Sequence, residues 1–229
     1  RRRAVCAYRR QGRLSTASPH AGFVDRQHVG RRFARVADTY GDGDFFAREI
    51  DRRMQERLDF VTLEPKRVLD LGCSRCGSFS GLATRYPDAD LIGLDVVPAM
   101  VSAGRVPRLG WQRWLGLGKR SEPLRVAADA SNLPLKSRST ALVWSNLLLH
   151  WLDDPIPALA EAHRVLDVGG LLMFSTLGPD TLKELRSSFA DGYAHTQRFA
   201  DMHDLGDMVV GCGFADPVMD METITLTYD

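Results

Sequence analysis

Apolar residues recur at steps of three and four through residues 31–60, which predicts a helical segment punctuated at Gly41-Asp42-Gly43-Asp44. Beyond it, short apolar runs alternate with helical periods. The runs predict strands over 67–73, 90–97, 124–130, 140–149 and 171–176. The segments with helical periodicity predict helices over 78–86, from Pro98 onward, over 155–166 (ending before Gly169-Gly170), over 179–190 and over 201–212. This alternation predicts an α/β fold with a doubly wound, mostly parallel sheet.

Composition agrees with one ordinary α/β domain. The chain has 229 residues, 44% of them hydrophobic and 26% charged, with a net charge of +1. This balance gives no overall field that would favour nucleic acid or a membrane, and no apolar run is long enough to span a bilayer. We expect a monomer that binds neither nucleic acid nor a membrane.

The two ends of the chain differ from its middle. Six arginines and no acid precede Val24, which predicts a disordered basic leader over 1–28 ahead of a domain over 29–229. Such a leader suits either a bacterial extension or a mitochondrial transit peptide. At the other end, 218–228 alternates as a last strand would, and the chain stops directly after it. We expect a domain that lacks its C-terminal strand or strands.

Candidate chemistry follows the first two predicted strands. In an open parallel sheet, ligands bind beyond the carboxyl ends of the strands. The first strand runs into the small-residue loop Asp70–Gly77, whose backbone N–H groups can approach a ligand, and the second ends at Asp95. A carboxylate at Asp95 can accept hydrogen bonds from both hydroxyls of a ribose. Together these features predict an adenine nucleoside cofactor.

The loop lacks the spacing that a dinucleotide needs and resembles the acid-x-Gly-x-Gly-x-Gly loop of class I methyltransferases. That resemblance implies a Rossmann-like fold and S-adenosylmethionine as cofactor. It implies the following cofactor-binding residues: Asp70, Gly72, Cys73, Ser74, Gly77, Asp95, Val96, Met100, Asp129, Ala130 and Asn146. Ser74 and Cys76 stand where the family has glycine. Cys76 would hinder binding if its φ is positive, unless Gly77 takes up the turn.

Cys73 and Cys76 also form a C-x-x-C pair. A zinc site would need a second pair, which the sequence lacks, so we expect no metal. A redox motif is the weaker interpretation, because the pair lies inside a loop that the cofactor motif already explains.

Several segments resemble the malonyl-acyl-carrier-protein O-methyltransferases of biotin synthesis. These segments are 32–40, 174–186, 197–199 and 222–226. The resemblance implies esterification of the free carboxylate of a malonyl thioester in the bacterial cytoplasm. This esterification needs no general base, because the carboxylate that attacks the methyl group is already ionised at neutral pH. The catalytic candidates are His150, Arg186 and Tyr40, with Arg186 orienting the carboxylate and Tyr40 covering the cofactor.

A basic insertion over 101–121 is a candidate docking patch for an acidic acyl carrier protein. It carries Arg105, Arg108, Arg113, Lys119 and Arg120 without an intervening acid. A solvated loop whose tryptophans pack locally is the alternative. Two other functions stay open: arginine hydroxylation, as in a similar mitochondrial complex I assembly factor acting in the matrix, and a non-catalytic cofactor-binding assembly module.

Overall fold

The computed structural model describes residues 24–104, 122–189, 191, 193 and 195–227, and the chain divides into two compact units. Val24–Thr176 forms the larger unit, which holds the whole sheet. The described part of the smaller unit lies in Leu177–Asp229.

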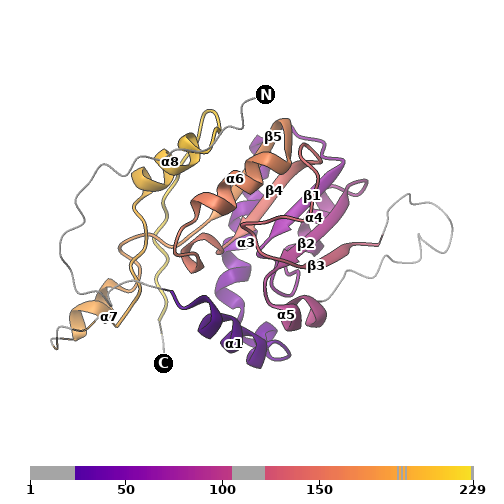
Figure 1. The fold of residues 1–229 in the computed structure, drawn as a ribbon. Helices are drawn as coiled ribbons and strands as arrows, with labels where there is room; N and C mark the ends of the chain where they lie inside the picture. The colour runs from indigo at the N-terminus through magenta and orange to yellow at the C-terminus, as the bar shows by residue number, and fades with distance from the viewer. Residues whose placement is uncertain (1–23, 105–121, 190, 192, 194, 228–229) are drawn as a thin grey trace. The chain divides into compact units, whose positions relative to one another are not determined.

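The larger unit is built on a five-stranded sheet in the order β3-β2-β1-β4-β5, in which every neighbouring pair is parallel. The strands are β1 (Arg67–Leu71), β2 (Asp90–Asp95), β3 (Leu124–Ala127), β4 (Thr140–Asn146) and β5 (Leu166–Ser175). Strand β1 lies in the middle, with Val68 beside Leu91 on one side and Leu142 on the other. The doubly wound parallel sheet predicted from the sequence is therefore confirmed (Figure 1).

Helices precede, connect and follow these strands. In the larger unit they are α1 (Arg26–Val36), α2 (Tyr40–Gly43), α3 (Phe45–Arg57), η1 (Leu58–Phe60), α4 (Phe79–Arg85), α5 (Pro98–Ala103), η2 (Leu149–Trp151) and α6 (Ile156–Val165). Right-handed crossovers place α4 and α5 on one face and α6 on the other. Pro98 opens α5 as predicted, since the first helical residue needs no N–H partner.

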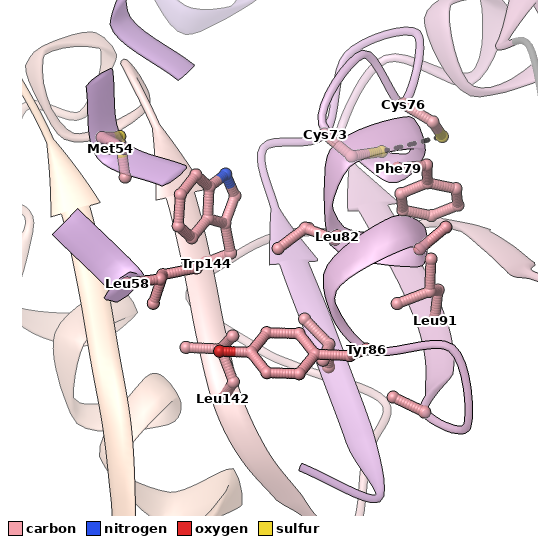
Figure 2. Packing of buried hydrophobic residues seen from close by; sticks show 13 residues of the cluster. Met54, Leu58, Cys73, Cys76, Phe79, Leu82, Tyr86, Leu91, Leu142 and Trp144 are labelled. Carbon is pink, nitrogen blue, oxygen red and sulfur yellow. Dashed lines mark hydrogen bonds between the residues drawn. The ribbon is translucent and has the colours of Figure 1, made fainter. Parts of the chain in front are cut away.

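The main core lies where α3 and α4 cover β1 and β4. Trp144 of β4 is fully buried there, among Met54 and Leu58 from the α3 side and Leu82 from α4 (Figure 2). The indole Nε1–H donates to Asp51 Oδ1 at 3.1 Å and to Ser78 Oγ at 3.2 Å. The largest side chain of the core thus also links α3, β4 and the start of α4.

Several predicted boundaries of the larger unit are corrected. Strands β1, β2 and β4 end two or three residues before the predicted 73, 97 and 149. Helix α6 ends at Val165, within a residue of its prediction, but β5 begins at Leu166 and not at Leu171, so Gly169 and Gly170 lie inside the strand, where Gly169 has φ +79° and the ladder with β4 shifts register. The glycines permit an irregular strand there. Strand β3 ends at Ala127, before the predicted Ala130. Helix α1 begins at Arg26, within the segment predicted to be a disordered leader.

The smaller unit contains α7 (Lys183–Ser188) and α8 (Met202–Gly211). Helix α8 matches its prediction, with Asp201 as N-cap and Gly213 at φ +98° beyond its end. The helix predicted from Pro179 starts only at Lys183, because Leu182 has a left-handed φ of +57°. The strand predicted over 218–228 is wrong for 218–227, the part described, because those residues join no ladder.

The described ranges leave out residues 1–23 and 105–121, so the basic leader and the basic patch at Arg105, Arg108, Arg113, Lys119 and Arg120 lie outside them. Among the helices that the structure describes, none has both the length and the apolar character needed to cross a bilayer.

Candidate cofactor site

The candidate site lies beyond the carboxyl ends of β1 and β2. The chain reverses its direction across the sheet between β1 and β4, and such switch points are where parallel sheets bind ligands. Gly72 and Cys73 follow β1, and their N–H groups both donate to the Leu94 carbonyl, at 2.8 and 3.0 Å. These bonds fix the loop Gly72–Gly77 against the end of β2, as the sequence predicted.

Three residues of this loop have left-handed backbone. Gly72 has φ +77°, Ser74 +49° and Cys76 +59°. The expectation that Gly77 would take up the turn is wrong, because Cys76 does so instead. At Gly72 a Cβ would lie 3.0 Å from the side chain of Leu148, so the glycine is required by space as well as by φ.

Asp70, the acid that opens the motif, is 2% exposed, and its Oδ2 atom has no hydrogen-bond partner among the residues that the structure describes. Burial, followed by the nearby Cys76, Asp51 and Asp95, raises the pKa of Asp70 well above its ordinary value. A buried carboxylate oxygen without a donor is costly, so it marks a place where a donor is expected to bind. An ammonium group fits this requirement, and S-adenosylmethionine carries one at its amino-acid end.

Asp95 ends β2 and faces the same loop. Its Oδ2 accepts from the Ser74 N–H at 2.9 Å and its Oδ1 from the Val97 N–H at 2.8 Å. Burial raises the pKa of Asp95 despite these two backbone bonds. Each carboxylate oxygen has a second lone pair, so the pair of ribose hydroxyls that the sequence predicted for Asp95 can still be accepted.

Asp129 follows β3 in a turn, where its Oδ1 accepts from the Ser131 N–H at 2.8 Å. Its Oδ2 pairs with the Arg26 guanidinium of α1 at 2.7 Å. Burial alone would raise the pKa of Asp129, but the Ser131 bond and Arg26 lower it overall. Since both side chains are about 40% exposed, at 42% and 39%, the pair contributes about 1 kcal/mol or less, and an adenine amino group could compete for the carboxylate.

The catalytic candidate Tyr40 lies at this site. It starts α2, is half-buried and hydrogen-bonds Ser74 of the loop. Burial, then Asp44 and Asp95, raise the pKa of Tyr40, so the phenol keeps its proton at neutral pH.

The residues at the end of β4 and just beyond it serve partly to hold the fold. Asn146 Nδ2 donates to the Ala47 carbonyl at 2.8 Å, and its Oδ1 accepts from Ser175 Oγ at 2.8 Å. Burial lowers the pKa of His150 to about 4, so its imidazole is neutral at neutral pH. The role of His150 toward a substrate acid stays a prediction, in which a neutral imidazole would act as a hydrogen-bonding group. The ring of His150 lies 5.1 Å from that of Trp151.

The remaining predicted residues divide between the two units. Met100 and Ala130 are buried, Val96 is exposed directly after β2, and the Met100 sulfur lies 4.0 Å from Ser74 Oγ. Their contacts with a cofactor stay predictions. Arg186 belongs to the smaller unit, where its guanidinium donates to the carbonyls of its own segment, at Pro179 and Thr181. Its role toward substrate also stays a prediction.

Two residues near the site were missed from sequence. Arg26 lay in the segment taken for a leader, so its pairing with Asp129 was not considered. Asp51 lies on α3 next to the apolar positions Ile50 and Met54. An acid on the apolar face of a helix needs a hydrogen-bond donor in the core, and this position in the sequence could have indicated one. Within the described ranges, no group of three or more histidine, cysteine or acidic side chains is arranged to hold a metal ion.

Comparison with known proteins identifies the kind of domain that carries this site. A model of the methyltransferase domain matches residues 69–174, from β1 to β5. In solved structures, a SAM-dependent methyltransferase of Thermotoga maritima aligns with a TM-score of 0.58 at 20% identity, over 82% of each chain. The [4+2]-cyclase SpnF aligns with a TM-score of 0.53 at 21% identity, over 71% of this chain and 56% of its own. These likenesses show the fold, which a cyclase shares, and leave the reaction open.

Sequence relatives are far closer. The malonyl-[acyl-carrier protein] O-methyltransferase of Laribacter hongkongensis is 49% identical over 91% of this chain and 71% of its own length. The protein of the same name from Gallionella capsiferriformans is 46% identical over 90% of this chain and 71% of its own length. The chain therefore belongs to the malonyl-[acyl-carrier protein] O-methyltransferase family.

Proposed function

We propose that this protein transfers a methyl group from S-adenosylmethionine to the free carboxylate of a malonyl group carried by an acyl carrier protein. The observation that carries the proposal is the 49% identity to the Laribacter protein over 91% of the chain. The family's place in biotin precursor synthesis supports the same reaction. Its relatives come from bacteria, which favours the bacterial cytoplasm over the mitochondrial matrix.

The cofactor would be held by three carboxylates at the carboxyl ends of three neighbouring strands, Asp70 within β1, Asp95 at the end of β2 and Asp129 after β3. Asp70 offers its unpartnered Oδ2 to the ammonium, Asp95 accepts from the ribose hydroxyls, and Asp129 accepts from the adenine amino group. The Gly72 backbone leaves room beside them. When bound, S-adenosylmethionine supplies the methyl group from its sulfonium.

The acceptor needs orientation more than activation. A malonyl carboxylate is ionised at neutral pH and is itself the nucleophile, so the protein's task is to hold it in line and to exclude water. Arg186 is the proposed bidentate partner, because a guanidinium matches a carboxylate in geometry. His150, neutral at this pH, would then act as a hydrogen-bonding group, and Tyr40 would cover the cofactor from α2.

The direct test is methyl transfer to malonyl-acyl carrier protein, followed by mass spectrometry of the carrier. We expect the malonyl carrier to gain one methyl group and an acetyl carrier, which has no free carboxylate, to gain none. Asp95→Asn, which keeps the shape of the side chain but weakens acceptance from the ribose, should reduce S-adenosylmethionine affinity at least tenfold, measured by calorimetric titration.

The outcomes separate the competing functions. Hydroxylation of an arginine peptide without methyl transfer would favour the assembly-factor activity. Cofactor binding without either reaction would favour a non-catalytic module. Failure of the reduced, full chain to bind S-adenosylmethionine would overturn both enzymatic proposals.

A further inference from the structure

Two cysteine thiols face each other inside the cofactor loop. The Sγ atoms of Cys73 and Cys76 lie 3.7 Å apart, and both residues are buried, at 5% and 2% exposure (Figure 2). A turn closed by the Cys76 N–H donating to the Cys73 carbonyl at 2.7 Å brings them together. Neither is in a disulfide in this structure.

The surrounding backbone leaves space for both sulfurs. A Cβ at Gly93 of β2 would lie 3.0 Å from Cys73 Sγ and 3.1 Å from Cys76 Sγ. A Cβ at Gly104, after α5, would lie 3.3 Å from Cys76 Sγ. The thiol pair thus occupies a site that two glycines border, and a disulfide would require the sulfurs to approach by only about 1.7 Å.

We propose that Cys73 and Cys76 form a reversible disulfide that switches cofactor binding off, an inference that rests on the proposed function for its effect on affinity. The disulfide would lock the 73–76 turn, in which the Ser74 N–H occupies Asp95 Oδ2 at 2.9 Å. Asp95 is the proposed ribose acceptor. Drawing the two sulfurs together would displace the Ser74 N–H that lies between them in the chain, and would move Asp95 out of the position in which its remaining lone pairs accept the ribose hydroxyls.

The two sulfurs are suited to different steps. The hydrogen bond between the two sulfurs lowers the pKa of Cys76, with Arg125 adding to the effect against burial, while the same bond and burial raise the pKa of Cys73. Cys76 is then the attacking thiolate. Its sulfur attacks a low-molecular-weight disulfide, releasing one thiolate. Cys73 next loses its proton and attacks Cys76 Sγ, releasing the second, so two protein thiols are oxidised as one disulfide is reduced to two thiols.

Access to the buried thiols requires the loop to open. The loop's outer residues are accessible, since Gly77 is exposed and Arg75 is half-buried, with its Nη1 donating to the Asp38 carbonyl at 3.2 Å. A cofactor that rests on the loop would hold it closed. We therefore expect S-adenosylmethionine to slow oxidation of the pair.

The sequence offers a specific assay. Arg75 lies between the cysteines, so trypsin yields peptides 68–75 and 76–85, which remain joined only through a Cys73–Cys76 disulfide. The full chain is equilibrated with mixtures of reduced and oxidised glutathione, quenched in acid, alkylated, denatured and digested. We expect the joined peptides to rise with oxidation and to vanish after dithiothreitol.

Cofactor affinity is measured on the same samples by calorimetric titration. We expect at least a tenfold weaker affinity for S-adenosylmethionine after oxidation, restored by dithiothreitol. The isosteric variant Cys76→Ser should bind equally well, within twofold, before and after oxidation. The matched control Cys212→Ser, which keeps both loop cysteines, should respond as the unmodified chain does.

Each outcome decides a separate point. If joined peptides never form, the disulfide is overturned. If they form and affinity is unchanged, the switch is overturned. If the reduced chain does not bind S-adenosylmethionine, the cofactor assignment fails and so does the switch, while the peptide assay still decides whether the disulfide exists.

Discussion

Ser74 and Cys76 show how a side chain can occupy a position that favours glycine. Both have left-handed φ, which strains a residue with a Cβ by about 1 kcal/mol or more. Their surroundings differ, because Ser74 is half-buried beside Met100, while Cys76 is part of the main core. The same substitution should therefore have different effects at the two positions.

We expect Ser74→Gly to raise the free energy of unfolding by about 0.5 to 1 kcal/mol, since it relieves strain and removes little packing. Cys76→Gly should not stabilise the protein, because the lost burial of its sulfur offsets the relief. Urea denaturation under reducing conditions measures both. A stabilisation by Cys76→Gly as large as that by Ser74→Gly would contradict this account.

Burial of His150 makes the stability of the folded protein decrease as the pH falls. Its pKa falls from an ordinary value near 6.5 to about 4 on folding, because burial disfavours the charged ring. Between these values the unfolded state binds the proton more strongly. The stabilisation from neutral His150 is therefore complete above about pH 6.5 and is lost as pH falls toward 4.

His150→Gln should remove this dependence. Between pH 7 and pH 5, we expect the melting temperature of the unmodified chain to fall more than that of the variant. Comparing the two chains cancels the opposite contributions of the buried Asp70 and the half-buried Asp51 and Asp95, whose pKa values are raised. Parallel curves for the two chains would show that His150 is not the group responsible.

At the scale of elements, α3 is held on the sheet by hydrogen bonds in addition to the packing of its apolar side chains. Asp51 accepts from the Trp144 indole, and the Ala47 carbonyl accepts from Asn146. Both partners lie in β4, near the carboxyl ends where the cofactor is expected. The helix is thus held in a fixed register over the site.

We expect Trp144→Phe to lower the free energy of unfolding by about 2 kcal/mol, since it leaves the half-buried Asp51 without its indole donor and loses core volume. Asp51→Asn should cost less, because its amide oxygen can still accept from the indole. Urea denaturation compares the two. A loss below about 0.5 kcal/mol for Trp144→Phe would show that the contact is dispensable.

The sequence predicted the central elements well because β1, β2 and β4 are buried apolar runs, and because Pro98, Asp201 and Gly213 mark helix ends. It failed where geometry depends on distant partners. Alternation over 218–227 does not make a strand without a ladder, and the glycines of β5 mark an irregular strand as readily as a helix end. For the site, it identified the three carboxylates but not the Arg26 pairing, which joins residues 103 positions apart.

For the whole molecule, the net charge is only +1, which gives no long-range attraction for an acidic carrier protein. Such a carrier would therefore be attracted only by local clusters of basic residues. The proposed patch includes Arg108 and Arg113. We expect Arg108→Glu with Arg113→Glu to raise KM for malonyl-acyl carrier protein severalfold while leaving S-adenosylmethionine affinity unchanged, because only the encounter with the acidic carrier is weakened.

Steady-state kinetics at two ionic strengths checks this expectation. The effect of the double substitution should shrink at high salt, where surface charges are screened. The matched control makes the same charge reversal outside the patch, Arg31→Glu with Arg32→Glu on α1. If both pairs raise KM equally, the patch has no specific role.

The start of the larger unit has a practical consequence for recombinant work. Asp25 caps α1 through the His28 N–H, the Val24 N–H donates to Asp153 Oδ1 at 2.7 Å, and Arg26 pairs with Asp129. A truncation at residue 29, where composition suggested that the domain starts, would remove all three contacts and leave the first turn of α1 uncapped. Expression vectors for crystallisation should therefore begin at or before residue 24, even if the arginine-rich leader is discarded.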